Sequence, residues 1–181
     1  MSDLQNNPVI EALMSRRSIK GYLNKQIEKK ELNIIVNAGK AAPTGRGNQS
    51  PKMVVIQDPE TVKKLSKMNA KILNSIKIDP FYGAPTVIVV FGNPDHSTWH
   101  EDGTLVLANL LIAAHGIGLG ACWIHRAKEM FETEEGKALM KEWGLEDNLI
   151  GIGNCIVGYP DPNCPPKEAK PRKDDYVTFI A

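Results

Sequence analysis

The sequence predicts an α+β fold, because helices and strands are mixed along the chain without a regular alternation. Several of the predicted strands are not separated by the crossover helices that a doubly wound sheet requires. One helix, residues 104–114, is apolar on nearly every side and is interrupted only by Asn109. Such a helix has to be covered all round, so it forms the core of the domain or of an oligomer. With 181 residues, 42% of them hydrophobic, the chain is long enough for one well-buried core, and residues 1–181 are predicted to form a single domain.

The first half of the chain is predicted to contain three helices and two strands. Asn7-Pro8 begins a helix, because Asn is a good capping residue and Pro suits the first helical position. This helix ends near residues 16–18, and its buried side is expected to consist of Val9, Ile10, Leu13 and Met14. A second helix starts near Glu28, a third is capped at Asp58-Pro59 and reaches about Ser75, and residues 42–51 form a turn-rich loop. Residues 52–56 and the β-branched run 86–91 are predicted strands.

The second half is organised around the apolar helix 104–114. Gly116, Gly118 and Gly120 end it, because glycine favours C-terminal caps and close backbone approach. A short buried strand, 121–124, follows, then a charged amphipathic helix that ends at Trp143-Gly144, then a strand at 149–157. Residues 160–173 form an extended tail, and 176–180 a terminal strand. This last strand has no obvious partner nearby in the sequence, so pairing with another subunit is a natural use for it.

The glycines also satisfy the pattern G-x-G-x-x-A over residues 116–121. A dinucleotide fingerprint must follow a strand and open a helix, so that the helix N-terminus faces the pyrophosphate. Here the glycines end a helix. The sequence therefore does not predict a Rossmann site, although backbone amides freed near residues 120–125 could still face a ligand.

Composition excludes several classes of protein. A net charge of +1 and a pI of about 7.7 give no overall attraction to nucleic acid or to an anionic membrane. The N-terminal residues contain no apolar signal core, and a cytoplasmic location is expected. Cys122, Cys155 and Cys164 form no C-x-x-C pair, so buried, reduced cysteines are expected rather than disulfides or a thiolate zinc site.

Two cation clusters are the strongest candidates for a binding role. Arg16, Arg17, Ser18 and Lys20 lie directly after a predicted helix, and residues 170–173 are Lys-Pro-Arg-Lys. Each cluster could be only a solvated helix end or a solvated tail. Each could also hold an anion, because Arg binds phosphate in a bidentate manner and Ser adds a neutral donor. Together with the loop 42–51 they would suit a phosphorylated cofactor. A metal site at His96, His100 and Glu101 is not predicted, because no third ligand has a defined position.

Five short motifs occur in the order found in the nitroreductase family, which the chain resembles over about residues 8–177. They are Arg16-Arg17-Ser18-x-Lys20, Ala42-Pro43-Thr44 with Gln49 and Ser50-Pro51 following, Gly118-Leu119-Gly120-x-Cys122-Trp123-Ile124, Gly158-Tyr159-Pro160 and Lys170-Pro171-Arg172. The resemblance implies an FMN-dependent NAD(P)H oxidoreductase. It also implies a central, mostly antiparallel sheet flanked by helices, in an intertwined homodimer with the flavin between subunits. Exchange of the terminal strand between subunits would suit such a dimer.

The resemblance also implies roles for individual residues. Arg16, Lys170 and Arg172 would hold the phosphate, with Arg17 and Ser18 along the phosphate and ribityl chain and Lys20 near flavin N1 and O2. Pro43, Thr44, Gly45 and Gln49 match the loop that the other subunit contributes. Trp123, Ile124 and His125 match the segment whose backbone lies against the ring near N5. The chain departs from many members at Gly47, where they carry Asn, and at Ser50-Pro51, where they carry Pro-Trp.

The implied chemistry requires no protein nucleophile, general base or metal, because the cofactor carries the reaction. Flavin N5 would accept a hydride from NADH or NADPH, and a nitroaromatic, quinone or similar small acceptor would then be reduced in a ping-pong mechanism. The alternatives are a dehalogenase-like or flavin-consuming relative, or an FMN-binding redox sensor without turnover. The residues that hold FMN are shared by all of these, so the sequence leaves them open.

Overall fold

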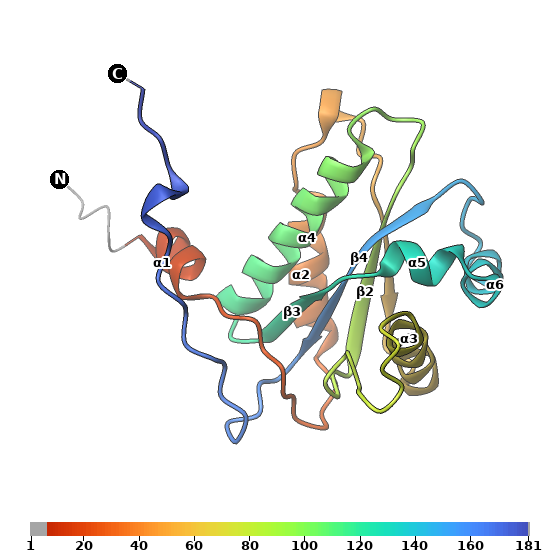
Figure 1. The fold of residues 1–181 in the computed structure, drawn as a ribbon, viewed down its shortest axis with the longest axis horizontal. Helices are drawn as coiled ribbons and strands as arrows, with labels where there is room; N and C mark the ends of the chain where they lie inside the picture. Colours follow the sequence, from red (N-terminus) through yellow and green to blue (C-terminus); the bar gives the residue numbers. More distant parts are fainter. Residues whose placement is uncertain (1–6, 181) are drawn as a thin grey trace.

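The computed structural model describes residues 7–180, in which a four-stranded antiparallel sheet has helices on both faces (Figure 1). The strand order is β1-β2-β4-β3, and every neighbouring pair is antiparallel. The strands are β1 (Lys52–Ile56), β2 (Thr86–Gly92), β3 (Gly120–Ile124) and β4 (Ile150–Gly158). The central strands β2 and β4 are buried along almost their whole length, because helices cover both faces of the sheet, and β2 is the β-branched run that the sequence predicted. The predicted α+β class is confirmed.

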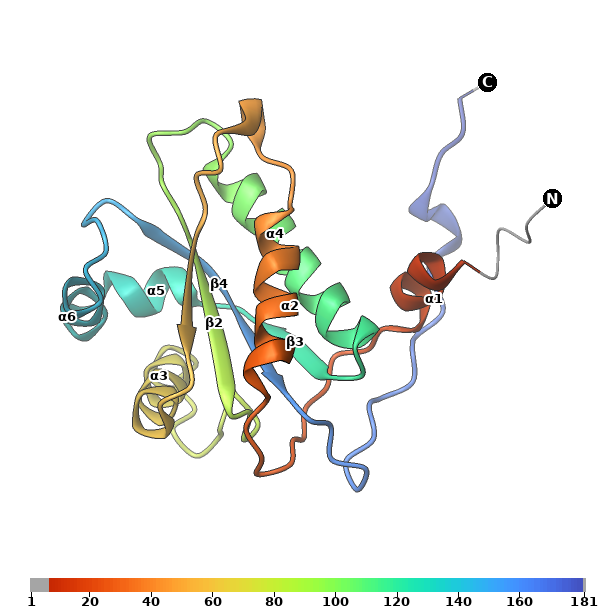
Figure 2. The same cartoon turned by 180° about the vertical axis from the view of Figure 1, so that it is seen from behind.

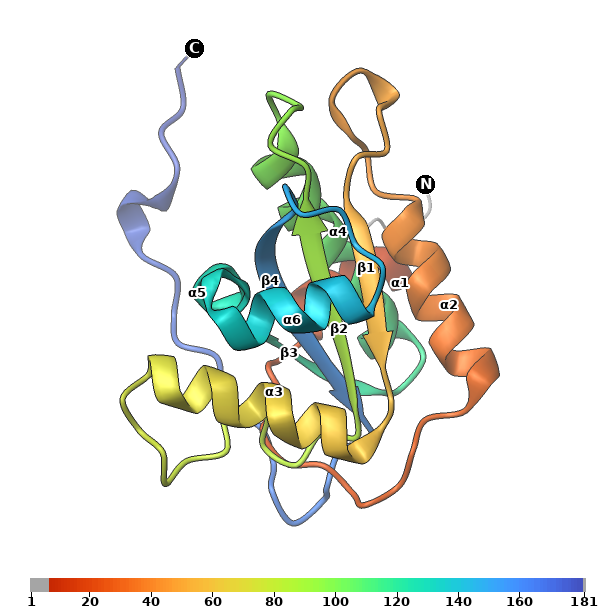
Figure 3. The same cartoon turned by 90° about the vertical axis from the view of Figure 1, so that its right-hand side faces the viewer.

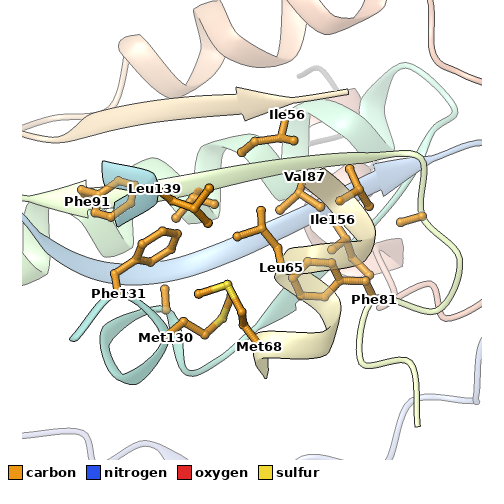
Figure 4. Packing of buried hydrophobic residues seen from close by; sticks show 14 of the residues in the cluster. Ile56, Leu65, Met68, Phe81, Val87, Phe91, Met130, Phe131, Leu139 and Ile156 are labelled. Carbon is orange, nitrogen blue, oxygen red and sulfur yellow. The ribbon is translucent and has the colours of Figure 1, made fainter. Parts of the chain in front are cut away.

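One face of the sheet is covered by α3 (Pro59–Ile72), α5 (Ala127–Glu132) and α6 (Glu134–Glu142). Figure 4 shows how these helices pack on the sheet: Leu65 of α3 and Phe131 of α5 lie in one apolar cluster with Val87 and Phe91 of β2. Phe91 and Phe131 contact edge to face, with ring centroids 4.8 Å apart. The single charged helix that the sequence predicted before Trp143 is two helices. Thr133 separates them, because its hydroxyl accepts from the Gly136 N–H at 3.0 Å and so caps α6.

The other face is covered by α2 (Lys29–Lys40) and α4 (Trp99–Gly116), which lie side by side in Figure 2. Ile35 and Leu110 contribute to a second core with Ile88, Val90 and Val157 of the sheet. The Tyr159 hydroxyl, just after β4, donates to Glu31 of α2 at 2.7 Å. This hydrogen bond lowers the pKa of Glu31 and, with burial, raises the pKa of Tyr159 to about 12.

The turn between α4 and β3 is the one that the glycines predicted. The Leu119 N–H donates to Ala114 O at 2.9 Å and the Gly118 N–H to His115 O at 3.0 Å, while Gly118 has φ +81°. This left-handed position favours glycine, and the two hydrogen bonds close the helix end. The glycines therefore end a helix and open a strand, which is the opposite order from a dinucleotide fingerprint.

Helix α1 (Pro8–Ser15) corrects one prediction. Asn7 caps it as expected, accepting from Val9 N–H at 2.9 Å. Its apolar side chains, however, are exposed rather than buried, by 46% to 75% for Val9, Ile10, Leu13 and Met14. The helix lies apart from the sheet in Figure 1 and contacts the end of α4, and this contact leaves its four apolar side chains exposed.

The C-terminal segment corrects another. The predicted strand 176–180 is absent from the described chain. Tyr176 ends a 3-10 turn (Asp174–Tyr176), and residues 177–180 pair with no described strand. A strand needs a neighbour for its backbone groups. Its proposed pairing with another subunit stays a prediction, and Phe179 and Ile180 are about nine-tenths exposed.

All three cysteines are free, and Cys122 and Cys155 are buried as predicted, whereas Cys164 is exposed because it lies in the tail.

Within the described part of the chain, every helix is too short or too polar to span a bilayer.

Candidate functional site

The residues after α1 lie alongside β3, the edge strand of the sheet. Ser18 forms a parallel bridge with Ala121, and the Ile19 N–H donates to Ala121 O at 3.1 Å. Residues 16–20, here called the cation segment, are thus placed beside the strand that carries Trp123 and Ile124. Two groups of predicted site residues that are about 100 positions apart in the sequence meet at this edge.

The charges of the cation segment act on β3. Burial raises the pKa of the Cys122 thiol, while a hydrogen bond with Ser18 and the positive charges of Lys20 and Arg16 partly oppose that rise. The Lys20 ammonium lies 5.3 Å from the centroid of the Tyr82 ring. Arg17 differs from its neighbours, because its guanidinium donates to the carbonyls of Met14 and Arg16, both at 2.9 Å. Arg17 therefore closes the end of α1, which is the structural role that a cation at a helix C-terminus often has.

The turn from β3 into α5 presents two free backbone donors. Arg126, the residue before α5, has a left-handed backbone, with φ 77° and ψ 16°. Neither the N–H of His125 nor that of Arg126 donates in any hydrogen bond found within residues 7–180. Trp123 is 49% exposed and contacts the His125 ring edge to face. The turn is therefore open to a ligand with hydrogen-bond acceptors.

Two asparagines hold this turn from inside the protein, and the sequence analysis did not identify them. Asn69 of α3 donates to His125 O at 2.7 Å, and Asn154 of β4 donates to Ile124 O at 3.2 Å. Both side chains are completely buried. A polar residue on the apolar face of a helix or inside an apolar strand indicates a buried side chain with a specific hydrogen-bond partner, because buried polar groups need such partners.

The loop with Pro43, Thr44, Gly45 and Gln49 lies at the start of α4. It includes the short helix η2 (Gly45–Gly47). Asp102, only 2% exposed, accepts from the Gly45 N–H at 2.9 Å, from Thr98 at 3.1 Å and from Ser50 at 3.3 Å. Arg46, Gly47 and Gln49 have φ values of 56°, 69° and 51°. Left-handed backbone is unfavourable for residues other than glycine, so this loop is held in a strained shape by a buried carboxylate.

Helix α4 keeps the loop and the cation segment apart. The loop is bound to Asp102 near the start of α4, whereas Ser15, next to the cation segment, hydrogen-bonds His115 near its end at 2.8 Å. Thirteen residues of helix correspond to about 20 Å. Figure 1 shows the loop above the start of α4 and the cation segment beyond its other end. One chain therefore does not bring these two groups of predicted residues together.

Lys170 and Arg172 lie in the exposed C-terminal tail. The tail overlaps α1 in Figure 1, but Figure 3 shows the two well separated. The described chain thus does not place these two cations on the cation segment. Their predicted part in a phosphate site stays a prediction.

Two further features do not coincide with this site. His96 lies 3.4 Å from the Asn48 amide, His100 contacts Trp99 edge to face, and no set of three metal-ligating side chains gathers anywhere in residues 7–180. A cavity of about 770 Å³ lies between α3 and the segment 76–85.

Comparison with known proteins agrees with this architecture. The model of the nitroreductase family matches residues 13–159. A crystal structure of a nitroreductase with bound FMN from Bacteroides fragilis has a TM-score of 0.89 and 26% identity, covering 97% of this chain and all of that one. An FMN-dependent nitroreductase from Clostridium difficile, also 26% identical, covers 95% of this chain and 99% of its own, with a TM-score of 0.75. A protein of Archaeoglobus fulgidus with the provisional name NADH dehydrogenase/NAD(P)H nitroreductase is 27% identical, over 83% of this chain and 84% of its own.

Proposed function

The chain belongs to the nitroreductase family, and from this we propose that it is an FMN-dependent oxidoreductase. It takes a hydride from NADH or NADPH and passes it to a small acceptor, such as a nitroaromatic or a quinone, in a ping-pong cycle. FMN supplies this chemistry when bound, by accepting and releasing a hydride at N5. The protein supplies binding, orientation and electrostatics.

The observation that carries the proposal is the edge formed by the cation segment, β3 and the β3–α5 turn. Arg16 and Ser18 offer a charged and a neutral donor for a phosphate or a polyol chain, and Lys20 adds a cation beside the same strand. The free N–H groups of His125 and Arg126 suit the acceptor atoms along the edge of a flavin ring. The residues present therefore fit FMN. A reduced flavin carries negative charge, which a nearby Lys20 would stabilise.

The second half of the site is proposed to come from another copy of this chain. The loop 43–50 lies about 20 Å along α4 from the cation segment, so it would serve the flavin of a partner in an intertwined homodimer. Exposed apolar residues on α1 and in the tail support such a dimer, because surfaces of this kind mark interfaces. Lys170 and Arg172 would complete the phosphate site in the assembled dimer, and residues 177–180 would pair with the partner.

Purification tests the cofactor and the reaction together. The protein should be yellow, the released chromophore should have the mass of FMN, and NADH or NADPH should be consumed continuously only when a quinone or nitroarene is present. A single bleaching of the flavin without turnover would instead favour a redox sensor. A colourless protein that does not bind added FMN would contradict the proposal, as would a flavin-loaded monomer in light scattering at low concentration.

Two substitutions test the proposed division of roles. Arg172→Ala should weaken FMN binding roughly tenfold to a hundredfold, since a charge-assisted contact to phosphate contributes about 1.5–3 kcal/mol. It should leave the potential of FMN-saturated protein unchanged, because the phosphate lies far from the ring. Lys20→Ala should retain more of the affinity but lower the flavin potential. If the potential shifts in Arg172→Ala and not in Lys20→Ala, the two roles are wrongly assigned.

A further inference from the structure

We propose that Asn69 and Asn154 are positioning residues that aim the backbone N–H groups of the β3–α5 turn at the cofactor. The inference rests on the proposed function, because it takes the turn of residues 124–126 to be a flavin contact. Beyond that function, the direction of the turn's N–H groups is assigned to two buried side chains that lie on the opposite side of the turn from those N–H groups.

The two amides approach the turn from different elements. Asn69 comes from α3 and reaches His125 O at 2.7 Å, and Asn154 comes from β4 and reaches Ile124 O at 3.2 Å. Neither side chain is exposed. Both also lie against the sulfur of Met130 in α5, at 3.2 Å and 3.8 Å from their amide nitrogens. Consecutive carbonyls of one turn are thus held by two side chains whose positions are set by packed secondary structure.

Peptide geometry converts these two contacts into control of the neighbouring donors. The six atoms of a trans peptide lie in one plane, with the carbonyl and the following N–H pointing in opposite directions. Holding Ile124 O therefore sets the direction of the His125 N–H, and holding His125 O sets that of the Arg126 N–H. Because both carbonyls point inward at buried amides, both N–H groups point away from Asn69 and Asn154. These are the two donors that have no partner within the described chain.

A purely structural role explains the two asparagines less well. Each side-chain oxygen is buried and has no hydrogen-bond partner among the described protein atoms. A buried unsatisfied acceptor costs roughly 1–3 kcal/mol, and here two occur at one place. The turn also contains Arg126 in a left-handed backbone, which costs a non-glycine residue about 1–2 kcal/mol. The two unsatisfied oxygens and the left-handed residue all lower stability, so they are better explained by the direction that they give to the N–H groups of the turn.

The chemical consequence is pre-organisation. Donors that already face the developing charge need no reorganisation during hydride transfer, and a misdirected donor loses most of its effect. Asn69→Leu and Asn154→Leu keep a side chain of similar size and remove the donor. Each variant, saturated with FMN, should accept hydride from NADH about tenfold or more slowly, with the KM for NADH nearly unchanged. Each should also lower the flavin reduction potential.

The control is Ser66→Ala, because Ser66 is a mostly buried polar residue of the same helix whose hydroxyl hydrogen-bonds Asp79 instead of the turn. It should reduce stability without moving the flavin potential. A measurement that needs no cofactor is NMR of the FMN-free protein. The N–H signals of His125 and Arg126 should be single in the wild type and in Ser66→Ala, and broadened or multiple in the two leucine variants. If Asn69→Leu does not fold, Asn69→Ser provides a smaller change, and the same shifts are expected.

The outcomes separate this inference from the proposed function. A wild-type protein that binds no FMN contradicts the proposed function itself. A wild-type protein that binds and reduces FMN, with leucine variants whose potential, hydride-transfer rate and N–H signals match those of Ser66→Ala, overturns the positioning role alone.

Discussion

Asp102→Ala is expected to release the loop of residues 43–50 from the start of α4. The Asp102 carboxylate is almost completely buried and accepts three hydrogen bonds, from Gly45, Thr98 and Ser50. The loop that it holds contains two non-glycine residues in left-handed backbone, each costing about 1–2 kcal/mol. Without the carboxylate, the hydrogen bonds that offset the cost of this loop conformation are lost.

The loss of stability in Asp102→Ala depends on which hydrogen-bond donors are left without a partner. The hydroxyls of Thr98 and Ser50 can rotate towards water or other acceptors, since Ser50 is only partly buried. The Gly45 N–H has a fixed direction and loses a hydrogen bond to a charged acceptor, which contributes about 1.5–3 kcal/mol. We therefore expect the free energy of unfolding to fall by about 1.5–3 kcal/mol. Asp102→Asn retains one oxygen for Gly45 and should cost roughly 1 kcal/mol.

Two assays on the same proteins check this reasoning. Urea unfolding followed by circular dichroism gives the change in stability, and titration of FMN into the folded protein gives the change in affinity. Because the loop is proposed to touch the partner's flavin, Asp102→Ala should weaken FMN binding even where the protein is fully folded, and Asp102→Asn should weaken it less. Unchanged stability would refute the hydrogen-bond assignment. Reduced stability with unchanged FMN affinity would refute the loop's place in the site.

Three further outcomes are expected. Gly120→Ala should lower the free energy of unfolding by about 1–3 kcal/mol in urea and weaken FMN binding, because the added Cβ would lie 2.9 Å from the Ile19 side chain. Gly116→Ala is the control: its Cβ would meet nothing within 4 Å, so stability should change by less than about 1 kcal/mol. Tyr159→Phe should lower stability most between about pH 5 and pH 9. The lowered pKa of Glu31 contributes stability that is lost as the pH falls through that pKa. The raised Tyr159 pKa of about 12 contributes stability that is present below about pH 10 and is lost as the pH rises through 12. A pH-independent effect in urea midpoints would contradict this linkage. Leu105→Glu, on an α4 residue that is 43% exposed in the single chain, should halve the mass seen by light scattering if α4 forms the dimer core. An unchanged dimer would place the interface elsewhere.

The sequence by itself determined the secondary structure of most of the chain and the order of its elements. Caps at Asn7 and Asp58, the glycine turn after α4 and the β-branched run of β2 are local signals, and each is present in the structure where it was predicted. The reason is that helix periods, strand alternation and caps depend on residues only a few positions apart. The order of five motifs also identified the family, although no motif did so alone.

The tertiary structure decided which residues meet and which remain exposed. Asp102 and Gly45 are 57 positions apart and Asn69 and His125 are 56 apart, so no local pattern connects them. The apolar face of α1 has the period of a buried helix, yet it is exposed, because periodicity shows that a helix has an apolar face and not what covers it. The sequence likewise predicted two groups of site residues, but only the packing of α4 showed that a single chain holds these two groups about 20 Å apart.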